Sequence, residues 1–218
     1  MIKAVIFDLD SCLAAADEVG KVLFAHAFDA IRAANEGHVP EDRLATAFND
    51  CWRFPFDFIC DKYGFTAEMR SAGFAAFAQT EVTQQMHGYG DLDVLRDIRA
   101  KLFLVTSGFR RLQLSKVKAL GIEHLLTELH IDAIDEEGPK GKRRAFESIL
   151  QKHQLAPAEV LVVGDNPESE IAAGNSLGIT TIQTIRPGVQ PSPNATHQVN
   201  SLHELKQFLT GLSPNGAD

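Results

Sequence analysis

Two stretches of the sequence, AVIFDLD at residues 4–10 and VLVVGD at residues 160–165, join an uninterrupted apolar run to an aspartate. A third run, LFLV at residues 102–105, is followed by Thr106-Ser107-Gly108. Short continuous apolar runs are typical of strands buried on both faces, as in parallel sheets. The carboxyl ends of parallel strands lie at one edge of the sheet, where ligands bind. We therefore expect the polar residues after these runs to converge.

From residue 91 onward, helical patterns alternate with further strand candidates at residues 127–131 and 180–185. Asp91 is expected to cap one helix, and Leu114, Val117 and Leu120 to form the buried face of the next. Alternation of this kind predicts βαβ units with right-handed crossovers, and hence an α/β fold with helices on both faces of a parallel sheet.

Residues 14–88 have a different character, because they show helical patterns, no convincing strand, and nine of the 14 phenylalanines. We interpret them as an all-helical insert, with residues 1–13 and 89–218 forming the main domain. Core packing is the favoured role for the aromatic residues of the insert, ahead of ligand stacking. Arg53, beside Trp52, is either a surface arginine that covers the core or a contact for an anionic substrate.

Composition limits the classes of partner and compartment. The chain has 218 residues, 44% of them hydrophobic, and a formal net charge of −8. That charge argues against nucleic acid or an anionic membrane surface as partner. Three cysteines without a CxxC pair indicate a reducing compartment. Because no apolar stretch approaches the roughly 20 residues of a membrane span, we expect a cytoplasmic protein. The sequence gives no indication of its oligomeric state.

The first two predicted strand ends carry oxygen-bearing side chains. Asp8 and Asp10 point the same way while strand geometry lasts, and two such carboxylates stay ionised most easily around a cation. Thr106 and Ser107 precede a helix, where hydroxyls and free amides can bind an oxyanion. A solvated turn and an ordinary capping turn are the simpler alternatives.

Two further junctions, GPKGKRR at residues 138–144 and GDNPESE at residues 164–170, complete the set. Cations near a helix N-terminus are unfavourable unless an anion lies nearby, while Asp, Asn and Glu offer the oxygen ligands that Mg²⁺ prefers. Each junction alone could be a simple helix cap. Together they predict a site for a divalent cation and an anion, as phosphoryl transfer requires.

At these motifs the chain resembles the haloacid dehalogenase-like hydrolase superfamily, over residues 4–10 and 92–185. The resemblance implies a Rossmann-like core and a helical cap at residues 14–88. It makes Asp8 the nucleophile and Asp10 the general acid/base. Thr106, with Ser107 beside it, would bind phosphate. Mg²⁺ would be held by Asp8, Asp165 and the Asp10 backbone carbonyl.

The resemblance offers alternatives at two positions and shows one departure. Lys140, six residues before Phe146, is the preferred phosphate lysine, and Lys142 is the alternative. Glu170 stands where the family often has a second acid, and it could hold a metal-bound water rather than the metal. Ser11-Cys12 replaces the commoner Gly-Thr pair, and we do not expect Cys12 to be a nucleophile because no histidine lies near it in sequence.

Asp10 divides the family by chemistry. An alkoxide leaving group needs a proton donor at that position, whereas a halide does not. The sequence therefore predicts a Mg²⁺-dependent phosphatase that acts on a small phosphorylated metabolite through an aspartyl-phosphate on Asp8. A phosphomutase is the alternative, and a haloacid dehalogenase or a non-catalytic binding module on the same fold ranks below both.

Overall fold

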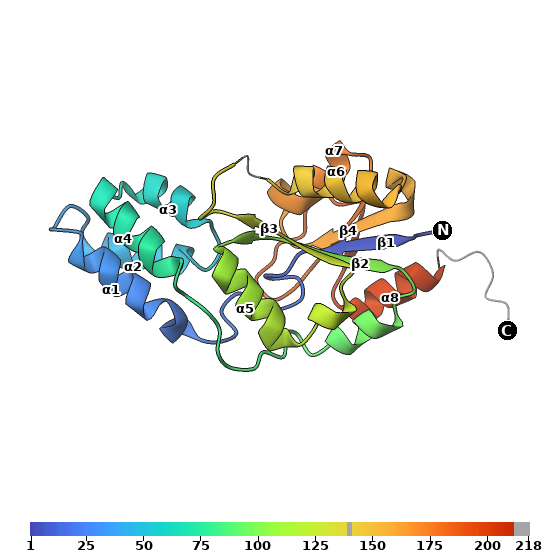
Figure 1. Ribbon diagram of the computed structural model, residues 1–218, viewed down its shortest axis with the longest axis horizontal. Coiled ribbons are helices and arrows are strands. Elements are labelled where there is room, and N and C mark those ends of the chain that lie inside the picture. The colour runs from blue at the N-terminus through green and yellow to red at the C-terminus, as the bar shows by residue number, and fades with distance from the viewer. Residues whose placement is uncertain (139–140, 212–218) are drawn as a thin grey trace.

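The computed structural model describes residues 1–138 and 141–211, and a six-stranded parallel sheet lies at its centre (Figure 1). The strand order is β3-β2-β1-β4-β5-β6. The strands are β1 (Ala4–Phe7), β2 (Lys101–Gly108), β3 (Glu128–Ala133), β4 (Val160–Gly164), β5 (Thr180–Thr184) and β6 (His197–Val199). The predicted parallel sheet is confirmed, although the short β6 lies beyond the strands that the sequence indicated.

The three apolar runs quoted above form the middle of the sheet. Strand β1 pairs with β2 on one side and β4 on the other, with Phe7 level with Leu104 and Val163. Each of its four residues is at most 1% exposed, which explains why the run is uninterrupted. The chain leaves β1 at Asp8, whose N–H still donates to the Val163 carbonyl at 2.9 Å.

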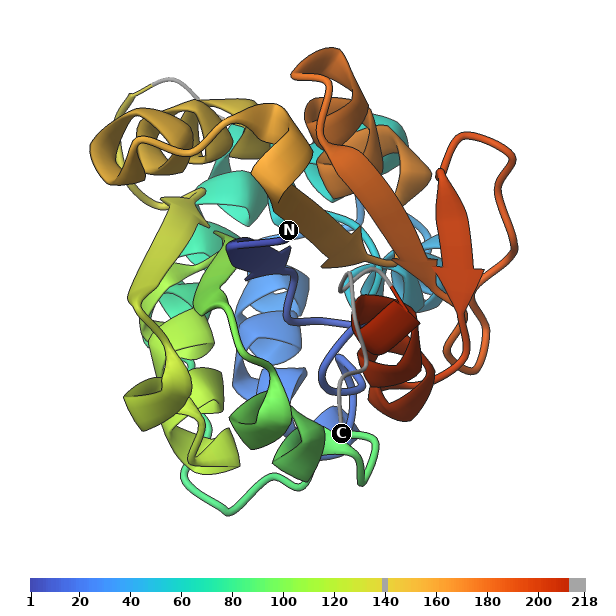
Figure 2. The ribbon, with the colours of Figure 1, turned by 90° about the vertical axis from the view of Figure 1, so that its right-hand side faces the viewer.

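Helices cover both faces of the sheet, as Figures 1 and 2 show, so the predicted α/β fold class is confirmed. Helices α6 (Lys142–His153) and α7 (Ala172–Ser176) lie on one face, and α5 (Arg110–Leu120) and α8 (Leu202–Gly211) on the other. Alternate residues of β1 pack against the helices on opposite faces of the sheet. Ile6 packs with Phe146 of α6, and Val5 belongs to the cluster that contains Val117 of α5. Short helical turns complete this part: η2 (Leu92–Asp97), η3 (Glu123–Leu125), η4 (Pro157–Glu159) and the π-helical η5 (Pro167–Ile171).

Two local predictions in this region are wrong. Leu114 is 45% exposed, because a spacing of three residues drifts around a helix of 3.6 residues per turn. The inward face of α5 instead carries Leu112, Gln113, Lys116, Val117 and Leu120. Asp91 precedes η2 without capping it. Its carboxylate accepts from the Leu202 N–H at 2.8 Å, at the start of α8.

The part of the chain between β1 and η2 folds into helices, which gather beside the end of the sheet opposite the N-terminus (Figure 1). They are η1 (Lys21–Phe24), α1 (Ala25–Ala33), α2 (Glu41–Asp50), α3 (Phe56–Tyr63) and α4 (Ala67–Phe77). Their aromatic side chains pack on one another, with Phe24 stacked on Trp52 at 4.0 Å and Phe28 on Phe48 at 4.2 Å between centroids. This packing agrees with the favoured core role.

The helical segment meets the rest of the molecule through apolar packing and through its two connections. Phe109, directly before α5, stacks on Phe77 with 5.3 Å between ring centroids. The Glu18 carboxylate accepts from the N–H groups of His87 and Gly88 at 2.5 and 3.0 Å, so the outgoing and returning connections lie side by side.

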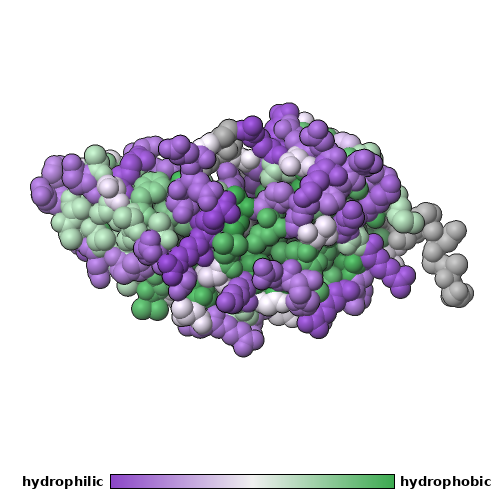
Figure 3. All heavy atoms as spheres, in the orientation of Figure 1, coloured by the Kyte–Doolittle hydropathy of each residue, from purple (hydrophilic) through white to green (hydrophobic). Residues whose placement is uncertain are grey.

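Hydrophilic residues cover most of the face seen in Figure 3, and hydrophobic residues reach the surface near its middle. Among residues 1–138 and 141–211, no helix has both the length and the apolar character needed to cross a membrane.

Candidate active site

The centre of the candidate site is Asp8, the first residue after β1. Asp8 is only 7% exposed. The ammonium of Lys142, the first residue of α6, lies 2.7 Å from Asp8 Oδ1. The neighbouring strand β4 ends at Gly164, and Asp165 follows it. The sheet thus brings the ends of the two aspartate-bearing runs together, as predicted.

Glu170 is the third acid of this cluster and is 1% exposed. Its Oε2 accepts from Lys142 Nζ at 2.8 Å, and its Oε1 accepts from the Asn166 N–H at 2.6 Å. A Cβ atom at Gly164 would overlap the Glu170 side chain. A glycine is therefore required at the end of β4 for Glu170 to turn back toward the sheet.

Asp8, Asp165 and Glu170 offer carboxylate oxygens that lie within 4.8 Å of one another. Burial raises the pKa of Asp8 to about 7, although Lys142 opposes the shift. Burial, followed by the charges of Glu170 and Asp8, raises the pKa of Asp165 to about 8. Burial alone would lower the pKa of Lys142, but the carboxylates of Asp8 and Glu170 raise it. When the three carboxylates and Lys142 are all ionised, the cluster carries three negative charges and one positive charge. Carboxylate oxygens with this excess of negative charge are suitable ligands for a divalent cation.

Of the two lysines considered for the phosphate position, Lys142 lies in this cluster. The preferred residue, Lys140, lies outside the described residues. Lys142 follows Gly141, whose φ of 109° belongs to the region that favours glycine. This backbone turn directs α6, and with it Lys142, toward the carboxyl end of β1.

Asp10 has a separate set of partners on α5. Its Oδ1 accepts from Lys116 Nζ at 2.6 Å and its Oδ2 from Gln113 Nε2 at 3.1 Å. The Lys116 side chain is 3% exposed and that of Asp10 27%. The two aspartates of the first motif are thus bound to different lysines from opposite faces of the sheet.

Thr106 and Ser107 lie near the carboxyl end of β2, and Thr106 is 1% exposed. The Ser107 hydroxyl donates to Asp132 Oδ2 at 3.2 Å, and the same oxygen accepts from the Gly141 N–H at 2.9 Å. Asp132 of β3 therefore joins the end of β2 to the residue before Lys142. Sequence inspection did not single out Asp132, Gln113 or Lys116. Gln113 and Lys116 could have been found in the sequence as two polar residues on the inward face of an amphipathic helix.

The departure at Ser11-Cys12 has a structural consequence. Ser11 adopts a φ of 57°, a left-handed conformation that glycine enters at no steric cost and other residues enter less readily. Cys12 is fully buried. Burial, with the nearby charge of Asp8 adding to it, raises the pKa of the Cys12 thiol well above its usual value. This agrees with the expectation that Cys12 is not a nucleophile, because the thiolate is the reactive form.

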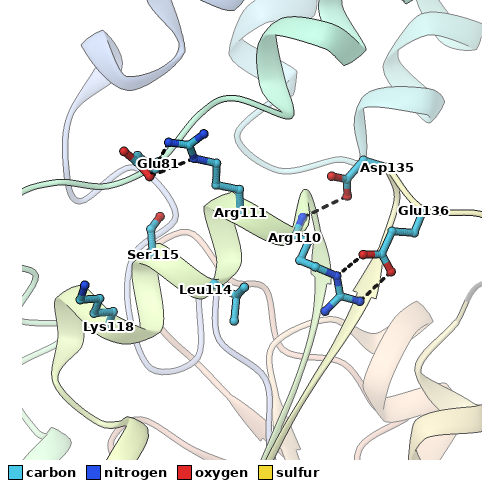
Figure 4. A pocket seen from close by; sticks show the side chains of 8 residues that line it. All are labelled: Glu81, Arg110, Arg111, Leu114, Ser115, Lys118, Asp135 and Glu136. Carbon is cyan, nitrogen blue, oxygen red and sulfur yellow. Dashed lines mark hydrogen bonds and ion pairs between the residues drawn. The ribbon is translucent and has the colours of Figure 1, made fainter.

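A hollow of about 480 Å³ lies along α5 and contains none of the clustered carboxylates (Figure 4). Two of the three cations that line it are engaged: Arg110 pairs with Glu136, and Arg111 pairs with Glu81 at 2.8 Å. Arg53, considered above as a substrate contact, does not line this hollow and is exposed.

Comparison with known proteins identifies the family. The model of the haloacid dehalogenase-like hydrolases matches residues 2–178. The chain belongs to this family. The haloacid dehalogenase-like resemblance is thus confirmed, and with it the prediction of a hydrolase.

The relatives agree with the predicted phosphoric monoester hydrolase. Glyceraldehyde 3-phosphate phosphatase of Methanopyrus kandleri is 29% identical over 201 residues, covering 85% of each chain. Pyrimidine 5'-nucleotidase YjjG of Escherichia coli is 34% identical over 126 residues, covering 55% of each. The magnesium-bound HAD hydrolase YfnB of Bacillus subtilis superposes with a TM-score of 0.62 at 18% identity, over 95% of this chain and 98% of its own. At that identity the superposition shows the fold alone.

Proposed function

We propose that this haloacid dehalogenase-like hydrolase is a Mg²⁺-dependent phosphatase that hydrolyses a small phosphate monoester through an aspartyl-phosphate on Asp8. The contact of Asp8 with Lys142 inside a cluster of buried acids carries the proposal. A carboxylate held in this way is directed by its counter-ion, and it can attack phosphorus once the charge of the incoming phosphate is offset.

The residues divide the reaction between them. Asp8 attacks phosphorus, and Asp10 protonates the alcohol as the phosphorus–oxygen bond to the leaving group breaks. Asp10 then takes a proton from the water that hydrolyses the aspartyl-phosphate. Lys142 offsets the charge of the phosphate beside Asp8, and Thr106 with nearby amides binds its other oxygens.

Asp8, Asp165 and the Asp10 backbone carbonyl would hold Mg²⁺, which when bound would offset the negative charge shared by phosphate and carboxylates. Glu170 would act on this ion indirectly. Both of its oxygens already accept hydrogen bonds, from Asn166 and Lys142, so positioning Lys142 and a metal-bound water is the role that its contacts favour.

The substrate is proposed to be a small phosphorylated metabolite, with the helical segment at residues 14–88 acting as a cap that excludes water. The names of the relatives, a triose-phosphate phosphatase and a nucleotidase, support this size range. Asp10 disfavours dehalogenation, since a departing halide needs no proton. A phosphomutase shares the first half of the reaction, and turnover that depends on added bisphosphate would identify it.

The proposal is tested by phosphate release from p-nitrophenyl phosphate, glyceraldehyde 3-phosphate, glucose 6-phosphate and uridine monophosphate, with and without Mg²⁺. Asp8→Asn should abolish turnover and covalent phosphate labelling. Asp93→Asn, an exposed aspartate of η2, serves as the matched control and should retain both. An active Asp8→Asn variant, or phosphate trapped on a different residue, would refute the role of Asp8.

A second pair of variants tests the lysine. Lys142→Met should lower kcat by at least about 10²-fold, the size of effect seen when a charge-stabilising group is removed from an active site. Lys140→Met, only two residues away, should change kcat little. The opposite order would return the phosphate-binding role to Lys140.

A further inference from the structure

Helix α5 places two polar side chains, Gln113 and Lys116, where its amphipathic pattern calls for apolar ones. They are 3% exposed and lie between the buried Leu112 and Val117. Residues three apart on a helix share a face. Burying an ammonium and an amide is costly unless each finds a partner, so this placement requires an explanation.

Both side chains end on Asp10. Lys116 Nζ lies 2.6 Å from Oδ1 and Gln113 Nε2 lies 3.1 Å from Oδ2, so each carboxylate oxygen has its own donor. Lys118, one position beyond Val117 on the same helix, is exposed. An exposed lysine such as Lys118 fits the amphipathic pattern of α5. The buried Lys116 does not fit it, so it is Lys116 whose position needs a reason.

The position of Gln113 is itself fixed by the end of β2. Its Nε2 also donates to the Ser107 carbonyl at 3.2 Å. A Cβ atom at Gly108 would come within 2.5 Å of that nitrogen, and Gly108 has a φ of 146°. The sequence supplies the one residue type that leaves room for this contact.

We infer that Lys116 and Gln113 are positioning residues that hold the Asp10 carboxylate in the direction needed for proton transfer. The inference rests on the proposed function, in which Asp10 serves the leaving alcohol and then the attacking water. The carboxyl oxygens of Asp10 offer about four lone-pair sites. The two donors occupy two of them and restrict the rotation of the group, which leaves a free site for the proton that Asp10 carries when the substrate binds. That proton moves to the alkoxide oxygen as the phosphorus–oxygen bond breaks, and the attacking water replaces it. A purely structural role for the pair would affect stability without discriminating between leaving groups.

The leaving group provides the test. p-Nitrophenolate departs with little need of a proton, whereas the alkoxides of sugar and nucleotide phosphates need one. The steady-state constants of wild type, Lys116→Met, Lys116→Arg and the control Lys118→Met are compared on p-nitrophenyl phosphate and on the panel's best alkyl phosphate. We expect Lys116→Met to lower kcat/KM for the alkyl ester about 10–100-fold, at or below the lower end of the roughly 10²–10⁴-fold contribution of general acid catalysis, because Asp10 itself is retained. The kcat/KM for p-nitrophenyl phosphate should change less than about two-fold, since slower hydrolysis of the aspartyl-phosphate does not enter this ratio. Lys116→Arg should recover most of the loss, and Lys118→Met should match wild type.

Pre-steady-state kinetics tests the second proton transfer. Because p-nitrophenolate still leaves readily while hydrolysis of the aspartyl-phosphate is slowed, Lys116→Met should show a burst of p-nitrophenolate approaching one equivalent per active site. Gln113→Met, which removes only an uncharged donor, should show the same pattern more weakly and replaces Lys116→Met if that variant does not fold. Equal losses of kcat/KM on both substrates, the absence of a burst, or full activity would overturn the inference. A wild type inactive on every phosphate ester would instead refute the proposed function.

Discussion

Substitution of Asp91 by alanine is expected to lower the free energy of unfolding by about 3–5 kcal/mol, the usual cost of leaving a buried charge without its partner. Asp91 meets Arg186 in a two-pronged ion pair, with oxygen–nitrogen distances of 2.9 and 3.0 Å. The side chains are 6% and 5% exposed. Because arginine does not lose its proton in proteins, the variant cannot relieve the cost by neutralising Arg186.

Other contacts of Asp91 and Arg186 determine how much unfolding free energy is lost in Asp91→Ala. Asp91 also accepts from the Leu202 N–H at the first residue of α8, and loss of such a cap costs about 1 kcal/mol. Against this, Arg186 keeps its hydrogen bond from Nε to the Cys12 carbonyl at 3.0 Å and lies 4.4 Å over the Tyr89 ring. These contacts remain in the variant and keep the expected loss within the stated range.

The measurement is urea unfolding followed by circular dichroism, with Asp97→Ala as the control. Asp97 of η2 pairs with Lys206 of α8 at 2.7 Å, but this pair is about half exposed, so its removal should cost less than about 1 kcal/mol. The double variant Asp91→Leu with Arg186→Met should recover most of the stability lost in Asp91→Ala. The reasoning fails if Asp91→Ala costs no more than Asp97→Ala, or if the double variant is less stable than the single one.

Three further outcomes are expected. Gly164→Ala should displace Glu170, cost about 1–3 kcal/mol through overpacking and weaken Mg²⁺ binding about 10–100-fold in calorimetric titration; unchanged affinity would separate Glu170 from the metal site. Phe109→Ala should cost about 3–5 kcal/mol in urea unfolding, and a loss below 1 kcal/mol would mean that the aromatic contact with the helical segment is dispensable. Glu128→Gln should be destabilising near pH 7, because hydrogen bonds from Lys152 and then His153 hold the pKa of Glu128 at about 2 in the folded protein, below its ordinary 4.5. That contribution is lost as the pH falls from 4.5 toward 2, so unfolding midpoints of the variant and wild type should converge there and a constant gap would contradict the assignment.

The fold could be predicted because its central strands are buried on both faces. Such strands leave uninterrupted apolar runs, and the runs at residues 4–7, 102–105 and 160–163 all became strands of the sheet. The edge strand β6 was missed because three residues, two of them exposed, carry no such pattern.

Parts of the site depended on contacts that sequence order cannot reveal. The lysines at positions 140 and 142 are chemically alike, and sequence order does not reveal that Lys142 contacts Asp8. Asp91 looked like a helix cap because its partner, Arg186, is 95 residues away. Local pattern predicts local structure, whereas the tertiary fold determines which distant side chains a charged residue contacts.

The arrangement also explains how two aspartates separated by one residue can take different roles. Leu9 between them is fully buried and fixes the chain, so Asp8 is directed to Lys142 and the other acids, and Asp10 to Lys116 and Gln113 on the opposite layer. In the proposed reaction Asp8 must face phosphorus beside a cation while Asp10 faces the leaving oxygen. Because Asp8 is paired with Lys142 and Asp10 with Lys116, neither carboxylate takes the hydrogen-bond donors of the other. The proposed division of roles within the motif thus follows from the sheet, which has α6 on one face and α5 on the other.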